Sequence, residues 1–424
     1  MCGIVAYLGH KPAVPLLLEG LKRLEYRGYD SAGIATLSED GLRIVKAVGR
    51  VANVEQRIEE IGGLPGTQGL AHTRWATHGG VTEANAHPHR DDRNGICLVH
   101  NGIIENYATI RRLLEDKGHT FVSETDTEVL ACLIGELFDP AAGMDLEKAV
   151  QAALREVTGA YSIAVMCEKE PGVLVCARKG SPLLVGVGNG EYVVASDGSA
   201  IIAHTAQAVT LDDYNVCRIT RDGFRTSTID NIELSPKVMQ LETELDEIEL
   251  GAFDHYMRKE IFEQPKALRT TMRGRLDEKE GRVVLGGLMA LAPQLVKSKR
   301  VILAAQGTAL HAAMIGEYLL EDLAKIPAEV EYASEFRYRN PIIEEGTVVV
   351  AVSQSGETAD TRAALQEARD RGALSLGVIN VVGSTIARET HAGVYCRVGP
   401  EIGVASTKAF TGQVAVLTMI ALFM

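Results

Sequence analysis

The pattern of short apolar segments changes near the middle of the chain, and this change limits the folds that the sequence can adopt. Up to about residue 220, apolar runs such as GLAHTRW and SIAVMC are separated by Gly and Asn residues. A dense series of short strands favours antiparallel sheets. After about residue 265, buried runs such as RVILAAQG and TVVVAVSQSG alternate with helical segments. That order of strand, loop and helix indicates a doubly wound parallel sheet.

The two patterns predict two domains joined by a polar segment. Residues 1–225 are expected to form an α+β domain, and residues 265–424 an α/β domain of flavodoxin-like type. The segment 226–264 is polar and acidic, which is typical of a linker. The chain ends inside an apolar helical run without a cap, as expected for a truncation or for a surface that another segment completes. Helices are predicted over residues 14–26, 107–116, 127–137, 146–157, 310–323 and 358–371.

Charge and cysteine usage exclude several classes of function. The formal charge is 43 − 56 = −13 and no basic stretch is present, which argues against nucleic acid and anionic membranes as partners. No signal peptide precedes the first strand, and the longest apolar run is too short to cross a bilayer. Seven cysteines without a CxxC pair favour a reducing compartment. We therefore expect a cytoplasmic protein.

Cys2 is the candidate nucleophile of the first domain. A residue this small at position two predicts removal of the initiator methionine, which leaves an α-amine of pKa ~8 beside the thiol. Such an amine can serve as the general base for the thiol, directly or through a water, so no catalytic histidine is required. An isolated cysteine at this position is more often inert. The assignment therefore depends on the motifs around it.

Six motifs occur in order in the first domain, namely MCGIVAYLG, LEYRGYDSAGIA, AHTRWATHG, NAHPH, VHNGIIEN and SETDTEV. Together they resemble the glucosamine-6-phosphate synthases, the isomerising glutamine:fructose-6-phosphate aminotransferases. The resemblance runs from the first residue to the last. It implies an N-terminal-nucleophile (αββα) glutaminase domain, followed by the first sugar isomerase (SIS) domain. It also implies L-glutamine and fructose 6-phosphate as substrates, no cofactor, and a homodimer in the full-length family.

The chemistry of glutamine hydrolysis agrees with the roles that this resemblance implies. A thiolate that attacks a carboxamide generates an oxyanion, and the Asn101 amide and the Gly102 backbone N–H fit the donors it needs. An isolated Asn-Gly pair would instead be a hairpin turn. Arg74 offers a fork for the α-carboxylate of glutamine. Asp126 can hold the α-ammonium, cap the following helix, or do both.

Further residues of the glutamine site rest on the resemblance alone. It implies that Trp75 gates the path of ammonia and that Arg27 supports the surroundings of the nucleophile. The alternatives are a core tryptophan and an ordinary surface ion pair. Thr77 and His78 are expected to shape the glutamine pocket, together with the NAHPH loop. Four histidines of this region match no metal template, so no metal site is predicted. They are His72, His78, His87 and His89.

A second polar group follows the strand TVVVAV in the second domain. Its hydroxyls and one amide surround the start of the predicted helix, where free N–H groups and the helix dipole favour an anion. The run SQSGET resembles the phosphate loop of SIS domains, ILAAQGTALHA a second sugar-phosphate loop, and EIGVASTKAF the stretch that lines the sugar. The predicted sugar-phosphate residues are Thr308, Ser353, Gln354, Ser355, Thr358, Val404, Ala405 and Ser406.

The sequence departs from the family pattern in three respects. Ala309 stands where the family commonly has Ser, which removes a hydroxyl worth about 1 kcal/mol, and Val382 stands where Pro is usual. The second SIS domain and the tail that carries the Schiff-base lysine do not follow, and Lys408 belongs to a different motif. We therefore expect this chain to hydrolyse glutamine without making glucosamine 6-phosphate. The alternatives are an amidotransferase with another acceptor and a sugar-phosphate-binding protein with a vestigial first domain.

Overall fold

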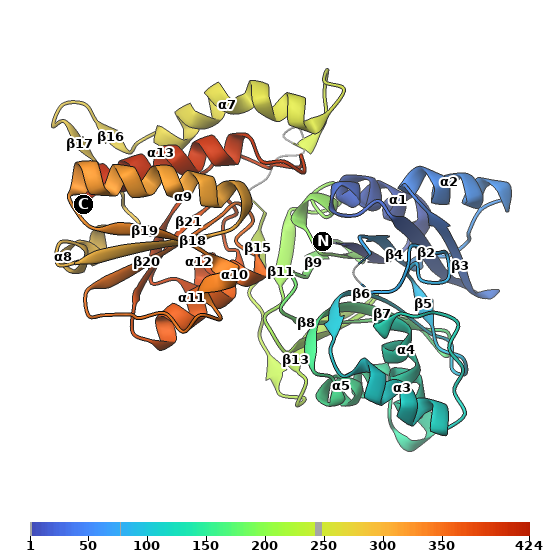
Figure 1. The fold of residues 1–424 in the computed structure, drawn as a ribbon. Helices are drawn as coiled ribbons and strands as arrows, with labels where there is room; N and C mark the ends of the chain where they lie inside the picture. The colour runs from blue at the N-terminus through green and yellow to red at the C-terminus, as the bar shows by residue number, and fades with distance from the viewer. Residues whose placement is uncertain (1, 77, 242–247) are drawn as a thin grey trace. The chain divides into compact units, whose positions relative to one another are not determined.

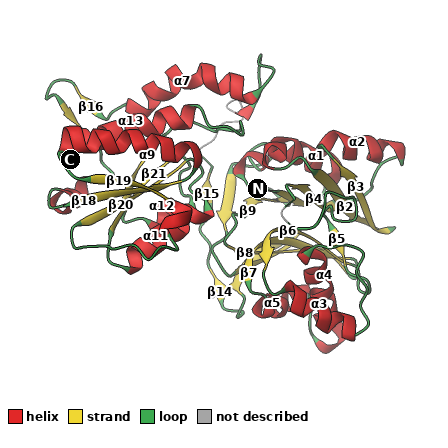
Figure 2. Cartoon of the chain, in the orientation of Figure 1, coloured by secondary structure: helices red, strands yellow, loops and turns green. Residues whose placement is uncertain are grey.

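The computed structural model describes residues 2–76, 78–241 and 248–424. They fall into two compact units, residues 1–245 and 246–424, which are considered separately below. Figure 1 labels the elements of each unit, and Figure 2 shows the change from a strand-rich to a helix-rich unit. Thr77, one of the predicted glutamine-site residues, lies outside the described residues.

Two antiparallel sheets form the centre of the first unit. The eight-stranded sheet has the order β15-β11-β9-β10-β1-β4-β2-β3, and the seven-stranded sheet the order β14-β13-β12-β8-β7-β6-β5. The strands of the first sheet are β1 (Gly3–Leu8), β2 (Ser31–Ser38), β3 (Gly41–Val48), β4 (Gln68–Arg74), β9 (Leu184–Val187), β10 (Tyr192–Ala195), β11 (Gln207–Thr210) and β15 (Met239–Gln240). Those of the second are β5 (His89–Arg90), β6 (Ile96–Ile104), β7 (Gly159–Cys167), β8 (Glu170–Lys179), β12 (Asn215–Thr220), β13 (Gly223–Thr228) and β14 (Glu233–Leu234).

The alternation of side chains along β1 and β7 explains the layering of this unit. Ile4, Ala6 and Leu8 of β1 pack in the core between the sheets, whereas Val5 and Tyr7 pack against a helix on the outer face. In β7, Ala164 and Met166 join the inner core, and its odd-numbered apolar residues face the helices of the second sheet. The helices of the unit are α1 (Ala13–Leu24), α2 (Val51–Glu60), α3 (Tyr107–Asp116), α4 (Asp126–Leu137) and α5 (Leu146–Glu156). The predicted αββα arrangement is confirmed.

A five-stranded parallel sheet forms the centre of the second unit, in the order β19-β18-β20-β21-β22. Its strands are β18 (Arg300–Ala305), β19 (Ala328–Tyr332), β20 (Thr347–Ser353), β21 (Leu374–Ile379) and β22 (Ala392–Tyr395), and a separate hairpin holds β16 (Leu276–Asp277) and β17 (Arg282–Val283). The helices are α7 (Tyr256–Met272), α8 (Ala292–Leu295), α9 (Gly307–Leu319), α10 (Ala333–Phe336), α11 (Ala359–Asp370), α12 (Thr385–Glu389) and α13 (Lys408–Phe423).

Helices cover both faces of the parallel sheet, as a doubly wound fold requires. Along β20, Val348, Val350 and Val352 pack with α9 and α13, whereas Val349 packs with α11. The chain leaves β18 in one direction to form β19 and continues in the other to form β20. The strand order therefore reverses at β18, and the loops after β18 and β20 lie at the kind of position where open α/β sheets bind ligands.

The predicted helices are present, with small differences at their ends. The segment predicted as 14–26 is α1 followed by a 3₁₀ turn at Glu25–Arg27, and the π-helical turn Leu320–Ala324 extends α9. The segment predicted as a linker contributes β14 and β15 to the sheets of the first unit. Within the described ranges, no helix combines the length and apolarity needed to cross a membrane.

Candidate active site

Cys2 lies directly before β1, in the wall of a pocket of about 380 Å³ in the first unit. Its sulfur accepts a hydrogen bond from the Trp75 backbone N–H at 3.2 Å and lies 3.5 Å from the Trp75 carbonyl oxygen. Burial raises the pKa of the Cys2 thiol, and the Trp75 N–H and the nearby Arg74 guanidinium act in the opposite direction. The strand β1 is paired on both sides, with β4 and β10, and this pairing holds the backbone next to Cys2 in place.

Asn101 and Gly102 lie on the same pocket wall, within β6. Asn101 Nδ2 donates to the Cys2 carbonyl oxygen at 3.0 Å, which ties the side-chain amide to the nucleophile's own backbone. Gly102 has φ +139°, and a Cβ there would lie 2.1 Å from the Ala160 carbonyl oxygen. This pair is therefore not the hairpin turn that an isolated Asn-Gly would suggest. It is a strand position that requires glycine.

Arg74 and Asp126 both line the pocket. Arg74 ends β4, and its buried guanidinium donates to the carbonyl oxygens of His78, Gly79 and Gly80. Asp126 is the first residue of α4 and accepts a hydrogen bond from the Ile104 N–H at 2.8 Å. The capping role considered for Asp126 belongs to Thr125, whose side chain accepts from the Glu128 N–H.

Arg27 forms a largely buried ion pair with Asp197 at the pocket wall, rather than an exposed surface pair. Burial alone would raise the pKa of Asp197, but the Arg27 guanidinium and the hydrogen bonds from Ser199 together hold this pKa below its usual value. The neighbouring Tyr26 hydroxyl accepts from Arg27 Nε at 3.0 Å, and burial raises the pKa of Tyr26 to about 12. This arrangement fixes the 3₁₀ turn that precedes β2.

Trp75 is 44% exposed, so the alternative of a core tryptophan is wrong. Its ring meets Tyr29 edge to face, with ring centroids 5.4 Å apart. An exposed ring beside the nucleophile is compatible with a gate. The gating role itself stays a prediction.

The four histidines of the predicted pocket region do not form one cluster. His72, His87 and His89 pack ring against ring, and His78 lies edge to face with Tyr107. Of these four, His78 and His87 line the pocket. Burial lowers the pKa of His72 to about 3 and those of His87 and His89 well below their usual value. These three imidazoles are therefore neutral.

The predicted phosphate loop joins the end of β20 to α11. Ser353 Oγ accepts a hydrogen bond from the Gly356 N–H at 3.0 Å and lies 3.1 Å from Thr358 Oγ1. Ser355 Oγ accepts from the Glu357 N–H. Gly356 has φ +66°, and a Cβ there would lie 1.9 Å from Ser384 Oγ. Glycine is therefore required, and the backbone of the loop is closely held.

Thr308 lies in the first turn of α9, directly after β18, and is exposed. Because β18 and β20 are adjacent parallel strands, the loop with Thr308 and the loop Ser353–Thr358 share one edge of the sheet. The segment Val404–Ser406 precedes α13 and is anchored by Glu401, which accepts from Ser406 Oγ at 2.8 Å. Val404 is 79% exposed. Lys408 is buried in an ion pair with Glu263 at 2.6 Å.

Comparisons with known proteins agree with this geometry. A glutamine amidotransferase domain model matches residues 72–203, and a SIS domain model matches residues 294–423. The chain is 52% identical to glutamine–fructose-6-phosphate aminotransferase [isomerizing] of Chlorobaculum tepidum and 50% identical to that of Bacteroides thetaiotaomicron. Each match covers 100% of this chain and 69% of the relative.

The chain belongs to this family of aminotransferases. Among solved structures, the C-terminal domain of glucosamine-fructose-6-phosphate aminotransferase from Francisella tularensis is 38% identical, with a TM-score of 0.39. That match covers 41% of this chain and 48% of the other.

The structure also shows contacts of the site that sequence patterns miss. His72 contacts Asn101, and Asp197 contacts Arg27. In each pair the two residues are far apart in the sequence, so no local motif marks the contact. Asp30, which accepts from the Ala76 N–H at 2.9 Å, positions the loop after Arg74 in the same way. The motif AHTRWATHG contains His72, yet nothing in its spacing distinguishes a pocket residue from one that lies behind the pocket.

Proposed function

We propose that the first unit hydrolyses glutamine with Cys2 as the nucleophile, and that the chain serves the family reaction, the glutamine-dependent formation of glucosamine 6-phosphate from fructose 6-phosphate. One observation carries the glutaminase proposal. The Cys2 thiol, the Asn101 amide, the Arg74 guanidinium and the Asp126 carboxylate all line one pocket, although they come from separate parts of the sequence. The names of the relatives support the choice of acceptor.

The pocket supplies the groups that amide hydrolysis needs. The Cys2 sulfur forms a bond to the amide carbon of glutamine while the carbonyl electron pair moves to oxygen, where the Asn101 amide and the Gly102 N–H stabilise the charge. The carbon–nitrogen bond then breaks, and nitrogen takes a proton and leaves as ammonia. Water hydrolyses the thioester and releases glutamate. Removal of Met1 would give the Cys2 amine that shuttles these protons.

Arg74 and Asp126 are proposed to recognise the α-carboxylate and α-ammonium of free glutamine, with Thr77, His78 and Trp75 completing the pocket and Arg27 supporting it. In the structure the Arg74 guanidinium donates to backbone carbonyl oxygens of the loop that follows β4. A substrate carboxylate is a stronger acceptor than these carbonyls, because its hydrogen bonds are charge-assisted.

The sugar-phosphate site is proposed at the edge of the parallel sheet where Thr308 and the loop Ser353–Thr358 meet. Hydroxyls there adjoin the N-termini of α9 and α11, which favour a phosphate. The segment Val404–Ser406 is proposed to line the sugar. Ala309 is buried and apolar, so its backbone N–H is the polar group left for a phosphate at that position.

The glutaminase proposal is tested by the release of glutamate from glutamine. We expect the chain purified without an N-terminal tag to lack Met1 by mass spectrometry and to release glutamate. Cys2→Ala should lower this rate by at least about 1,000-fold, because no other group replaces the nucleophile. Cys97→Ala is the matched control, since Cys97 is a fully buried thiol of the inter-sheet core that lies outside the pocket. Equal rates for Cys2→Ala and the unaltered chain would overturn the assignment.

The acceptor is tested separately. Fructose 6-phosphate is added to the same preparation, its binding is measured by calorimetric titration, and glucosamine 6-phosphate is assayed. Product above background would mean that this chain completes the family reaction by itself, whereas binding without product would mean that it supplies the glutaminase and sugar-phosphate sites only. Binding that is lost in Ser353→Ala and Thr358→Val supports the predicted loop. We also propose a homodimer, a cytoplasmic location and functional domains near 1–225 and 265–424, and sedimentation velocity tests the first of these.

A further inference from the structure

We propose that His72 is a positioning residue for glutamine hydrolysis, which acts by orienting the side-chain amide of Asn101. This inference rests on the proposed function. It assigns a role to a histidine that makes no contact with the pocket itself, since His72 lies behind the wall that Asn101 provides.

The contact between the two side chains is direct and buried. His72 Nε2 lies 2.9 Å from Asn101 Oδ1, and His72 is completely inaccessible to solvent. Asn101 is also largely buried, and its Nδ2 donates to the Cys2 carbonyl oxygen at 3.0 Å. The amide is therefore held at both ends, by His72 on one side and by the nucleophile's backbone on the other.

These two contacts fix which way the amide points. A carbonyl oxygen can only accept hydrogen bonds, so Asn101 must present its NH₂ group to the Cys2 carbonyl oxygen. The amide oxygen must then face His72, and His72 must carry its proton on Nε2 in order to donate. The second N–H of the Asn101 amide is left for the pocket. If the amide were reversed, its oxygen would face another carbonyl oxygen and the pocket would lose this donor.

The surroundings of His72 keep it in the role of a neutral donor. Its ring stacks on that of His87 with centroids 4.1 Å apart, which fixes the plane of the imidazole. The strand β4 holds its backbone between β1 and β2, where His72 lies opposite Ile4 and Gly33. Burial keeps the ring uncharged. A rigid, uncharged donor at this place restricts the Asn101 amide to a single orientation without adding a charge beside the thiol.

The consequence concerns the rate of the chemical step more than the binding of glutamine. An oxyanion donor acts in the transition state, and loss of one such donor typically lowers kcat about 100-fold to 1,000-fold. A donor that is present but poorly oriented should lose part of that effect. Binding of the α-carboxylate and α-ammonium depends on other residues, so KM should change little.

Two substitutions of His72 by neutral amides test whether a hydrogen-bond donor is needed at the position of Nε2. Gln places an amide N–H close to the position of Nε2, whereas Asn is one bond shorter and does not reach Asn101. We expect His72→Asn to lower kcat for glutamine hydrolysis about 30-fold with KM within about 3-fold, and His72→Gln to retain most of the activity. Alkylation of Cys2 by iodoacetamide, which forms no oxyanion, should proceed at an unchanged rate in both.

A double-substitution cycle tests whether His72 acts through Asn101. If it does, the variant with both His72→Asn and Asn101→Ala should be no slower than Asn101→Ala alone. His119→Asn is the matched control, because His119 is a buried histidine of the same unit, bonded at both ring nitrogens, that lies outside the pocket. Its kcat should equal that of the unaltered chain.

Several outcomes would overturn the inference. Multiplicative losses in the double variant, an unchanged kcat in His72→Asn, or equal losses in the Gln and Asn variants each contradict it. Nitrogen-15 NMR of the unaltered chain keeps the test decisive if a variant does not fold, because a His72 signal with the proton on Nδ1 also contradicts it. Absence of hydrolysis in the unaltered chain would instead reject the proposed function.

Discussion

Gly102 illustrates how a single residue can be required by its backbone alone. Its φ of +139° lies in a region that L side chains rarely adopt, and the Ala160 carbonyl oxygen occupies the space where a Cβ would lie. The pairing of β6 with β7, in which Gly102 lies opposite Tyr161, brings the Ala160 carbonyl oxygen to this position. The residue that is proposed to supply an oxyanion donor is thus also one that alanine can replace only at a cost in stability.

We expect Gly102→Ala to lower the free energy of unfolding by about 3 kcal/mol, because a strained backbone and a close contact add together. Glutamate release should fall at least about 10-fold, since the relief of this contact moves the N–H. Gly172→Ala is the control, as its φ is +78° but no atom lies within 4 Å of the added Cβ. Its cost should be only about 1 kcal/mol, for the left-handed backbone. Urea denaturation measures both, and equal costs would contradict the role of the Ala160 contact.

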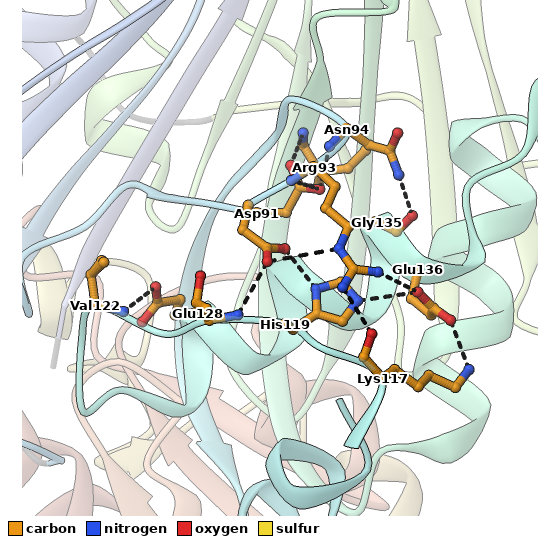
Figure 3. A network of polar contacts seen from close by, with 12 residues as sticks. Asp91, Arg93, Asn94, Lys117, His119, Val122, Glu128, Gly135 and Glu136 are labelled. Atoms are coloured by element: carbon orange, nitrogen blue, oxygen red, sulfur yellow. Dashed lines mark hydrogen bonds and ion pairs between the residues drawn. The ribbon is translucent and has the colours of Figure 1, made fainter. Parts of the chain in front are cut away.

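At the level of elements, a polar network joins the loop after β5 to α3 and α4 (Figure 3). The buried His119 ring, just after α3, contacts Asp92 at 2.6 Å through Nδ1 and Glu136 of α4 at 3.1 Å through Nε2. Lys117 and Arg93 neutralise the same carboxylates. Cys132 lies close to Asp92 and His119, but both ring nitrogens of His119 already have partners. We interpret the group as a closed ion-pair network that holds the two helices to the loop.

The network predicts a pH dependence of stability. Burial alone would raise the pKa of Asp92, but the contact with His119 and the hydrogen bond from the Thr120 N–H together hold this pKa below its usual value. Lys117 and His119 lower the pKa of Glu136 in the same way. A carboxylate whose pKa is lowered by folding stabilises the protein above its unfolded pKa, about 4 for these groups, and this contribution is lost as pH falls through the folded pKa. We expect His119→Asn to destabilise the chain at pH 6, and the difference to shrink below about pH 4. Urea denaturation across this range measures it, and a difference that does not depend on pH would contradict it.

Elements were predictable from local patterns, whereas the contacts of the site were only partly so. Tyr107–Asp116 forms the predicted helix because its apolar and polar residues follow the helical period throughout. At α4 the sequence suggested Asp126 as the cap, but Thr125 has that role. Which of two neighbouring residues is the cap depends on the backbone angles at the helix start, and the sequence does not give these. The contact of His72 with Asn101 joins residues 29 positions apart and depends on which strands are neighbours, which periodicity does not reveal.

For the whole molecule, each unit has hydrophobic clusters of its own, built from its own sheets. Two compact units of this kind typically unfold as separate cooperative transitions. We expect scanning calorimetry to show two transitions. Gly102→Ala should lower the midpoint of the first unit's transition, and Gly356→Ala that of the second unit's transition. Both glycines meet a close contact when a Cβ is added, but in different units. A single transition that both substitutions lower equally would contradict this expectation.

The position of β1 in its sheet has a consequence for synthesis on the ribosome. β1 is made first, but its two neighbours, β4 and β10, begin at Gln68 and Tyr192. Non-local pairing of this kind delays folding, because strands far apart in the chain must meet before either is stabilised. The strand that directly follows Cys2 therefore waits for nearly 200 residues of growing chain before both of its edges are paired. The thiol acquires its complete pocket only after most of the first unit has left the ribosome.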